Sequence, residues 1–159
     1  MPRRGEDDTV RIVLIATFGA LGVACMGCAL PFAALAIPNF VEMQYRAKRA
    51  EVPANVDGLK TAELAYDAAF DEFVPVRAHP RRPEHLGKEP VPWHGNPDFE
   101  MLGWAPDGDV RGTYWVEVSP DGSDFTVFGM GDMDGDGVPA LYTATKSINT
   151  VFANNNNTY

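Results

Sequence analysis

The sequence predicts an α+β protein in which a long N-terminal transmembrane helix extends into an amphipathic helix packed on a small antiparallel β-sheet. Three observations predict this fold class. Residues 12–37 are apolar and uncharged, residues 38–73 carry apolar side chains at steps of three and four, and residues 111–147 hold three segments rich in β-branched and aromatic residues. A helical element followed by consecutive short strands is typical of the α+β class.

The apolar run predicts a transmembrane span. Its 26 residues cover roughly 39 Å as a helix, which exceeds the roughly 30 Å of bilayer hydrocarbon. A cleaved signal peptide would have a shorter apolar core of about 7–15 residues. Leu21-Gly22-Val23-Ala24 before Cys25 leaves a lipid-anchored protein as an alternative. Cys25 and Cys28 have CxxC spacing, but apolar surroundings disfavour the thiolate that redox chemistry needs.

The helix that follows is expected over residues 38–73. Its polar face is expected to be solvated and carries Arg49, Asp57, Lys60, Glu63 and Asp67. The apolar face needs a sheet to cover it and consists of Val52, Val56, Leu59, Ala62, Tyr66, Ala69 or Phe70, and Phe73.

Residues 75–110 are expected to form a proline-rich connector, because proline interrupts both helices and strands. Its three histidines have no common zinc-site spacing. The β-meander over residues 111–147 is expected from strands at Thr113–Val118, Asp124–Met130 and Ala140–Lys146, with a turn at Pro120-Asp121-Gly122. Residues 148–159 are expected to be a tail.

The loop before the last strand has the oxygen spacing of a calcium site. Asp132, Asp134 and Asp136 alternate, and Gly137 follows in the sixth position, as in the first half of an EF-hand loop. The twelfth position is Thr143 in place of the bidentate glutamate, so a complete EF-hand is excluded. Two interpretations remain: a weak calcium site, or a turn whose aspartates accept backbone hydrogen bonds.

The composition excludes several functional classes. Residues 42–159 hold 19 acidic and 10 basic side chains, so nucleic acid is not an expected partner. The sequence contains no activated nucleophile with a base and no phosphate-binding glycine loop. We therefore expect no enzyme activity, no catalytic residues and no cofactor other than calcium.

The helical segment resembles a known family. Ile37-Pro38-Asn39-Phe40, Arg46-Ala47-Lys48, Glu51 and Thr61-Ala62-Glu63 follow one another as in type IV pilins and type II secretion pseudopilins. Further along, Phe99–Trp104, Pro106-Asp107-Gly108, Val110-Arg111 and Tyr114 resemble the strand entry of bacterial pilin-like proteins. The resemblance implies a pilin-like fold, and it favours calcium because major pseudopilins carry a calcium site in their C-terminal region.

The processing site departs from the family pattern. Counting back from Pro38 places Ala16 at the leader glycine, Thr17 at the mature N-terminus and Leu21 at the family's glutamate. Leucine cannot form the ion pair that a buried glutamate makes with a neighbouring subunit. We therefore expect a degenerate, poorly processed N-terminus.

The resemblance implies a structural or accessory subunit of a type IV pilus or type II secretion filament, anchored in the bacterial inner membrane by one span. Residues 1–11 would be cytoplasmic, and residues 38–159 would form a pilin-like domain in the periplasm or on the cell surface. The expected partners are the membrane, copies of the chain and other pilin or pseudopilin subunits. The alternative is an unprocessed, membrane-anchored or lipid-anchored calcium- or ligand-binding domain that does not polymerise.

Overall fold

The computed structural model describes residues 11–17, 38–154 and 158–159. The chain divides into two compact units, Met1–Met43 and Gln44–Tyr159, and the sheet belongs to the second. The described part of the chain is α+β, with one five-stranded antiparallel sheet in the order β1-β2-β3-β4-β5.

The predicted transmembrane helix over residues 12–37 requires a correction. Among the residues that the structure describes, no helix is both long enough and apolar enough to cross a membrane. The helix over residues 11–17 spans only about 10 Å, and the helical residues after Pro38 carry several charges. The predicted fold class is therefore wrong in its transmembrane helix. The predicted placement as a single-pass inner-membrane protein is contradicted by the same finding. Residues 18–37, which include Cys25 and Cys28, lie outside the described residues.

The amphipathic segment is helical over residues 38–49, turns at Ala50 and continues as α2 (Glu51–Phe70). The interruption has a local cause, because Pro53 has no N–H to donate to the carbonyl of Arg49. The helix ends earlier than residue 73, at Asp71, which has a left-handed φ of 56° and donates its N–H to the carbonyl of Asp67.

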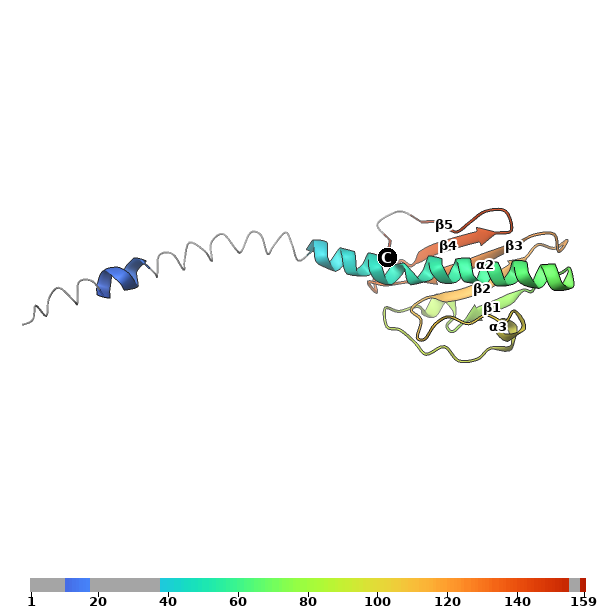
Figure 1. Ribbon diagram of the computed structural model, residues 1–159, viewed down its shortest axis with the longest axis horizontal. Coiled ribbons are helices and arrows are strands. Elements are labelled where there is room, and N and C mark those ends of the chain that lie inside the picture. The colour runs from blue at the N-terminus through green and yellow to red at the C-terminus, as the bar shows by residue number, and fades with distance from the viewer. Residues whose placement is uncertain (1–10, 18–37, 155–157) are drawn as a thin grey trace, which may run out of the picture. The chain divides into compact units, whose positions relative to one another are not determined.

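Four antiparallel pairings build the sheet, which α2 crosses (Figure 1). β2 (Thr113–Val118), β3 (Phe125–Gly131) and β4 (Ala140–Thr145) form the meander. β3 alternates strictly between buried and partly exposed residues, which is the period of a strand with one covered face. In the first hairpin, Asp121 accepts hydrogen bonds from Ser119 and Ser123, and these lower its pKa to about 2.

Two edge strands lie in segments that the sequence assigns to loops. β1 (Val76–His79) falls in the expected connector and pairs with β2, and β5 (Val151–Phe152) falls in the expected tail and pairs with β4. The connector also contains a 3-10 turn, η1 (Pro83–His85), and a short helix, α3 (Pro97–Met101). The α3 helix starts where Asn96 accepts the N–H of Asp98 at 2.9 Å.

The end of the chain contributes to the domain. Tyr159 is buried, and its carbonyl accepts the N–H of Met133 at 2.9 Å. The guanidinium of Arg49 lies over the rings of Phe152 and Tyr159, at 4.7 Å and 5.2 Å from the centroids. Such cation–π contacts join the end of the helical stretch of residues 38–49 to β5 and the C-terminal residue.

The core depends on a close approach of α2 to β3. A Cβ atom added at Gly129 would lie 2.4 Å from Cγ2 of Val56 and 2.9 Å from Cγ1 of Val52. At Gly131 an added Cβ would lie 2.5 Å from Cε of Met133. Glycine at these two inward-facing positions therefore allows the helix valines to pack directly on the strand backbone.

We predict that Gly129→Ala lowers the free energy of unfolding by about 1–3 kcal/mol, because the added methyl group overpacks a filled core. Denaturant titration followed by circular dichroism measures the effect. Gly87→Ala is the matched control, since its added Cβ meets no heavy atom closer than 3.7 Å. Equal stability of the two variants would contradict the proposed close contact.

Candidate functional site

The three predicted calcium-ligand residues lie together. Asp132, Asp134 and Asp136 each offer a carboxylate oxygen within 4.8 Å of the others. Asp132 is buried, Asp134 is partly buried and Asp136 is exposed. Within the described residues, this is the one group of three or more His, Cys, Asp or Glu side chains close enough to share a metal ion.

Backbone hydrogen bonds hold the same carboxylates in place. Asp132 accepts N–H groups from Gly135 at 2.7 Å and Gly137 at 3.1 Å, through different oxygens. Asp134 accepts the N–H of Asp136, and Asp136 accepts that of Val138. Gly135 and Gly137 adopt φ of 79° and 84°, a region that favours glycine. The loop is therefore pre-organised as a turn, and its carboxylates are crowded together.

The crowding affects protonation. Partial burial is the main cause that raises the pKa of Asp134, and the negative charges of Asp136 and Asp132 add to it. A divalent cation relieves such repulsion, and clustered carboxylate oxygens are ligands that calcium prefers. The arrangement can thus hold a hard cation or stand alone as a turn, the two interpretations that the sequence leaves open.

A hollow of about 560 Å³ lies beside the loop, lined by Asp134 and Gly135 on one side and by the connector on the other. The connector contributes Arg81, His85 and Lys88 to its walls. The Lys88 side chain passes close to Gly135, where an added Cβ would meet its Cδ at 3.5 Å. Basic and acidic groups therefore share this hollow, although its two walls are far apart in the sequence.

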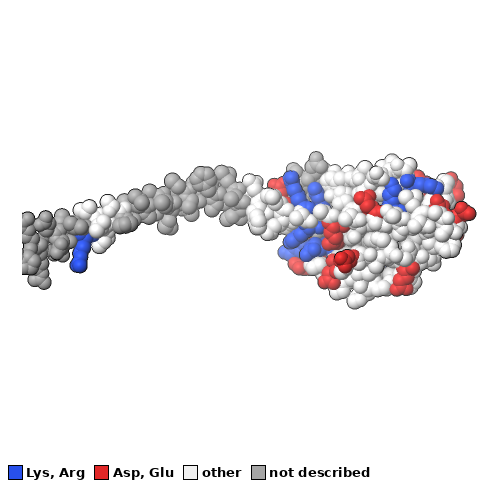
Figure 2. Space-filling view, in the orientation of Figure 1, with Lys and Arg blue, Asp and Glu red and all other residues white. Residues whose placement is uncertain are grey.

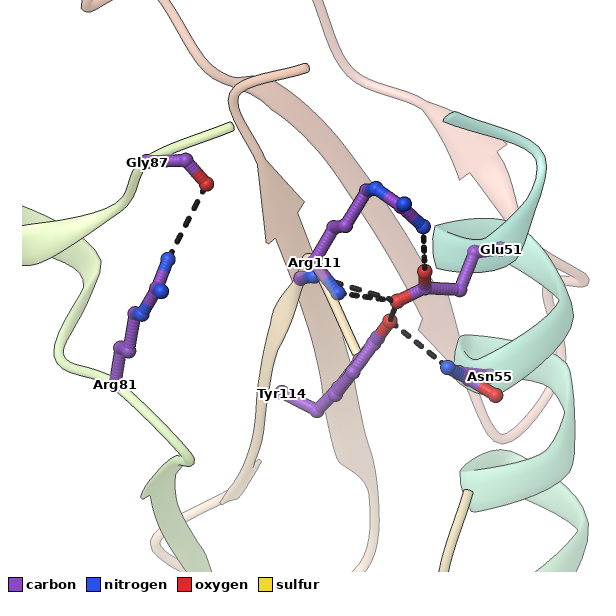
Figure 3. A network of polar contacts seen from close by, with 7 residues as sticks. Glu51, Asn55, Arg81, Gly87, Arg111 and Tyr114 are labelled. Atoms are coloured by element: carbon purple, nitrogen blue, oxygen red, sulfur yellow. Dashed lines mark hydrogen bonds and ion pairs between the residues drawn. The ribbon is translucent and has the colours of Figure 1, made fainter. Parts of the chain in front are cut away.

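A second polar cluster joins the start of α2 to β2 (Figure 3). Oε1 of Glu51 accepts the backbone N–H of Arg111 at 2.8 Å and the hydroxyl of Tyr114 at 3.1 Å. Asn55 donates to the same hydroxyl at 2.9 Å, and the Arg111 guanidinium lies 3.7 Å from Oε2 of Glu51. Burial raises the pKa of Tyr114, so its hydroxyl stays a hydrogen-bond donor. The cluster positions the helix, although Nε of Arg111 is buried without a hydrogen-bond partner among the described residues.

The three connector histidines do not form a shared site. His79 contacts the carbonyl of His94 through Nε2 at 2.9 Å and the amide of Asn96 through Nδ1 at 3.3 Å. Its ring also packs edge-on against Trp93. His79 therefore serves to fix the connector on β1.

Comparisons of the chain with protein-family models, with curated proteins and with solved structures find no match. The resemblance to pilins and pseudopilins thus stays a prediction, carried by the residues quoted for it.

The prediction that the polar face of α2 is solvated is wrong at two positions. Glu63 is fully buried and Lys60 is 8% exposed. The Lys60 ammonium donates to the carbonyl of Ile148 at 2.9 Å and to the side chain of Asn149 at 3.0 Å. Oε2 of Glu63 accepts the N–H of Val74 at 3.1 Å. Both side chains thus satisfy loop groups beyond the helix, and the sequence pattern carries no signal for such distant partners.

The carboxyl group of Glu63 lies in a buried environment that disfavours its ionised form. Its Oε1 is buried and has no hydrogen-bond partner among the described residues. Burial is the main cause that raises the pKa of Glu63 to about 7, and the nearby carboxylate of Asp67 adds to it, while the Val74 N–H opposes it. Near neutral pH the folded protein therefore holds a proton that the unfolded chain releases.

We predict that Glu63 makes stability fall as pH rises. The pKa of Glu63 is about 7 in the folded protein, whereas its ordinary value is 4.5. Ionisation of Glu63 therefore lowers the free energy of unfolding progressively between about pH 4.5 and pH 7, and outside this range the contribution of Glu63 does not change with pH. Glu63→Gln keeps an acceptor for Val74 and should be more stable than the wild type at pH 8 by roughly 1–3 kcal/mol. At pH 4.5 the two should be equal.

Thermal and urea unfolding at both pH values measure this difference. Glu89→Gln, at an exposed position of the connector, is the control and should follow the wild type at each pH. A Glu63→Gln variant with the wild-type pH dependence would show that this carboxyl is not the group responsible.

Proposed function

We propose that this chain is a structural or accessory subunit of a filament of the type IV pilus or type II secretion kind, with no catalytic role. The observation that carries the proposal is the helical continuity of the resembling segment. Ile37 lies outside the described residues, but the rest of the quoted segment is helical on both sides of the single turn at Ala50. The resemblance implies that such a helix packs against neighbouring subunits.

Exposed apolar side chains support the proposal. Phe40 is 60% exposed and Met43 is 68% exposed, and both lie on the helical stretch of residues 38–49. Large apolar side chains gathered on one exposed helical stretch mark an interaction surface more often than isolated ones do. Glu51, another residue of the resembling segment, accepts hydrogen bonds within the domain.

The test is site-specific photo-crosslinking in the native host. A benzoyl-phenylalanine probe at Met43 should give covalent adducts with copies of the chain or with filament subunits, and the chain should be present in sheared filaments. Met101 is the matched control, because it is 57% exposed and lies on α3 outside the resembling segment. Equal adducts from both probes, or no chain in the filament fraction, would overturn the proposal.

A second function, calcium binding, is favoured by the cluster of Asp132, Asp134 and Asp136. Without a glutamate at Thr143, we expect a dissociation constant near 10⁻⁴–10⁻³ M, the range of extracellular modules. A cation bound only by the folded state raises stability by mass action. At ten times the dissociation constant the gain is about 1.4 kcal/mol.

We expect excess calcium to raise the melting temperature by several degrees relative to excess chelator. Asp134→Asn should abolish this increase, because the amide keeps an oxygen for the Asp136 N–H but lacks the charge. Asp109→Asn, at an exposed position outside the loop, should leave the increase intact. If calcium and chelator give the same melting temperature for the wild type, the loop is a turn without a cation.

A further inference from the structure

Asp-Gly dipeptides are the places in a protein chain where an aspartate rearranges most readily. The backbone nitrogen of the following residue attacks the side-chain carboxyl carbon, and glycine, which lacks a Cβ atom, leaves that nitrogen accessible. The chain contains five such dipeptides, and the structure describes all of them. Acidic side chains occupy several separate places on the surface in Figure 2, so exposure alone does not single out one dipeptide. The five begin at Asp57, Asp107, Asp121, Asp134 and Asp136.

In four of the five dipeptides the glycine nitrogen already donates a hydrogen bond. Gly58 lies inside α2, where N–H groups bond to carbonyls of the preceding turn. Gly122 donates to a backbone carbonyl of its own turn at 2.9 Å. Gly135 and Gly137 donate to the carboxylate of Asp132 at 2.7 Å and 3.1 Å. A hydrogen-bonded N–H keeps its proton and its orientation, so these four nitrogens are poor nucleophiles.

The aspartate carboxylates of the same four dipeptides are also hydrogen-bonded. Asp57 accepts a threonine hydroxyl, and Asp121 accepts two serine hydroxyls. Asp134 and Asp136 each accept a backbone N–H within their loop. Hydrogen bonds of this kind favour the ionised carboxylate. An ionised carboxylate resists attack by a nitrogen, because its oxygen leaves as water only after protonation.

The dipeptide Asp107-Gly108 differs from the others at both residues. Among the described residues, neither the Asp107 carboxylate nor the Gly108 N–H has a hydrogen-bond partner. Both residues are exposed and lie in a bend between α3 and Val110. A Cβ atom added at Gly108 would meet no heavy atom within 4 Å outside the adjoining residues. The bend therefore has room for the ring that the rearrangement forms, and no hydrogen bond holds the two reacting groups apart.

We propose that Asp107 is the site at which this chain forms isoaspartate. The nitrogen of Gly108 bonds to Cγ of the protonated Asp107 side chain. The C–O bond to the hydroxyl of that carboxyl group breaks, and the hydroxyl leaves as water with the proton of the nitrogen, which closes a five-membered succinimide. Water then opens the ring at either carbonyl. The product is aspartate or isoaspartate, in which the main chain runs through Cβ and Cγ, and the reaction needs no oxidant or cofactor.

The rearrangement places one additional carbon atom in the main chain ahead of Val110. Val110 is buried and exchanges two backbone hydrogen bonds with Val91, at 2.8 Å and 2.9 Å. These contacts hold the chain beyond the bend, so the change stays within the exposed segment and the domain remains folded. The product exposes a free α-carboxylate, the chemical group that isoaspartyl methyltransferases esterify. The site does not depend on the filament or calcium proposals.

Incubation of the full chain at neutral pH in water enriched in heavy oxygen tests the site, because each succinimide that opens incorporates one labelled oxygen. Peptide mapping by mass spectrometry should find label at Asp107 at least fivefold faster than at Asp121. The comparison is matched within the chain, since both aspartates are exposed and both lie in the tripeptide Pro-Asp-Gly. Electron-transfer fragmentation of the labelled peptide should identify isoaspartate at Asp107.

Two further pairs of measurements separate structure from local sequence. Asp107→Asn and Asp121→Asn should both react faster than the aspartates, because ammonia leaves more readily than water, and the ratio between the sites should persist. Asp107→Glu should abolish the labelling, since its side chain would have to close a less favourable six-membered ring. In guanidinium chloride the two wild-type sites should react at similar rates, because only folding distinguishes them.

Circular dichroism melting verifies that each variant folds. Equal rates at Asp107 and Asp121 in the folded chain would overturn the proposal. A faster reaction at another Asp-Gly dipeptide, or a difference between the two sites that persists in denaturant, would overturn it as well.

Discussion

The close packing of α2 on the backbone of β3 is the contact on which the rest of the domain depends. Val52 and Val56 occupy the space that side chains at Gly129 and Gly131 would fill. Because the helix approaches so closely, the strands on both sides reach it as well, and Tyr114 on β2 can place its hydroxyl beside Glu51 and Asn55. A bulkier residue at Gly129 would lift the helix and lengthen all of these hydrogen bonds together.

Polar side chains of α2 form hydrogen bonds that attach further segments of the chain to the helix. Glu51 accepts backbone N–H groups at the start of β2, Lys60 donates to the loop before β5, and Glu63 accepts the N–H of Val74 before β1. Each satisfies backbone groups that would otherwise be costly to bury. The helix thus fixes three separate segments, and for Glu63 the cost is a carboxyl that is hard to ionise.

The Asp loop is linked to the same core. Met133 lies between two of the clustered aspartates, its side chain is fully buried and its N–H donates to the carbonyl of Tyr159. The carboxylates on either side are therefore held by a residue anchored in the core. A cation bound there would stabilise a loop that is already connected to Tyr159 and, through the contact of Arg49 with Tyr159, to the helical stretch of residues 38–49.

Local patterns determined several features of this protein. The strand propensities of Thr113–Val118 coincide with β2, the Pro120-Asp121-Gly122 turn joins β2 to β3, and the alternation of Asp132, Asp134 and Asp136 places three carboxylates within reach of one ion. Each of these depends on residues that are neighbours in the chain. The signal for the start of α3, Asn96 followed by Pro97, is also local in the sequence. This helix was not predicted from the sequence, because the surrounding prolines favoured a loop.

Tertiary structure decided the features that depend on distant partners. β1 is a strand because β2 offers it a partner, and β5 likewise depends on β4. Glu63 and Lys60 are buried because loops far along the chain supply their hydrogen bonds. The length of the uncharged apolar run alone predicted a span over residues 12–37, whereas no helix among the described residues is both long enough and apolar enough to cross a membrane. Hydrophobic periodicity predicts which side chains of an element are buried, but only the packed structure determines which groups cover them.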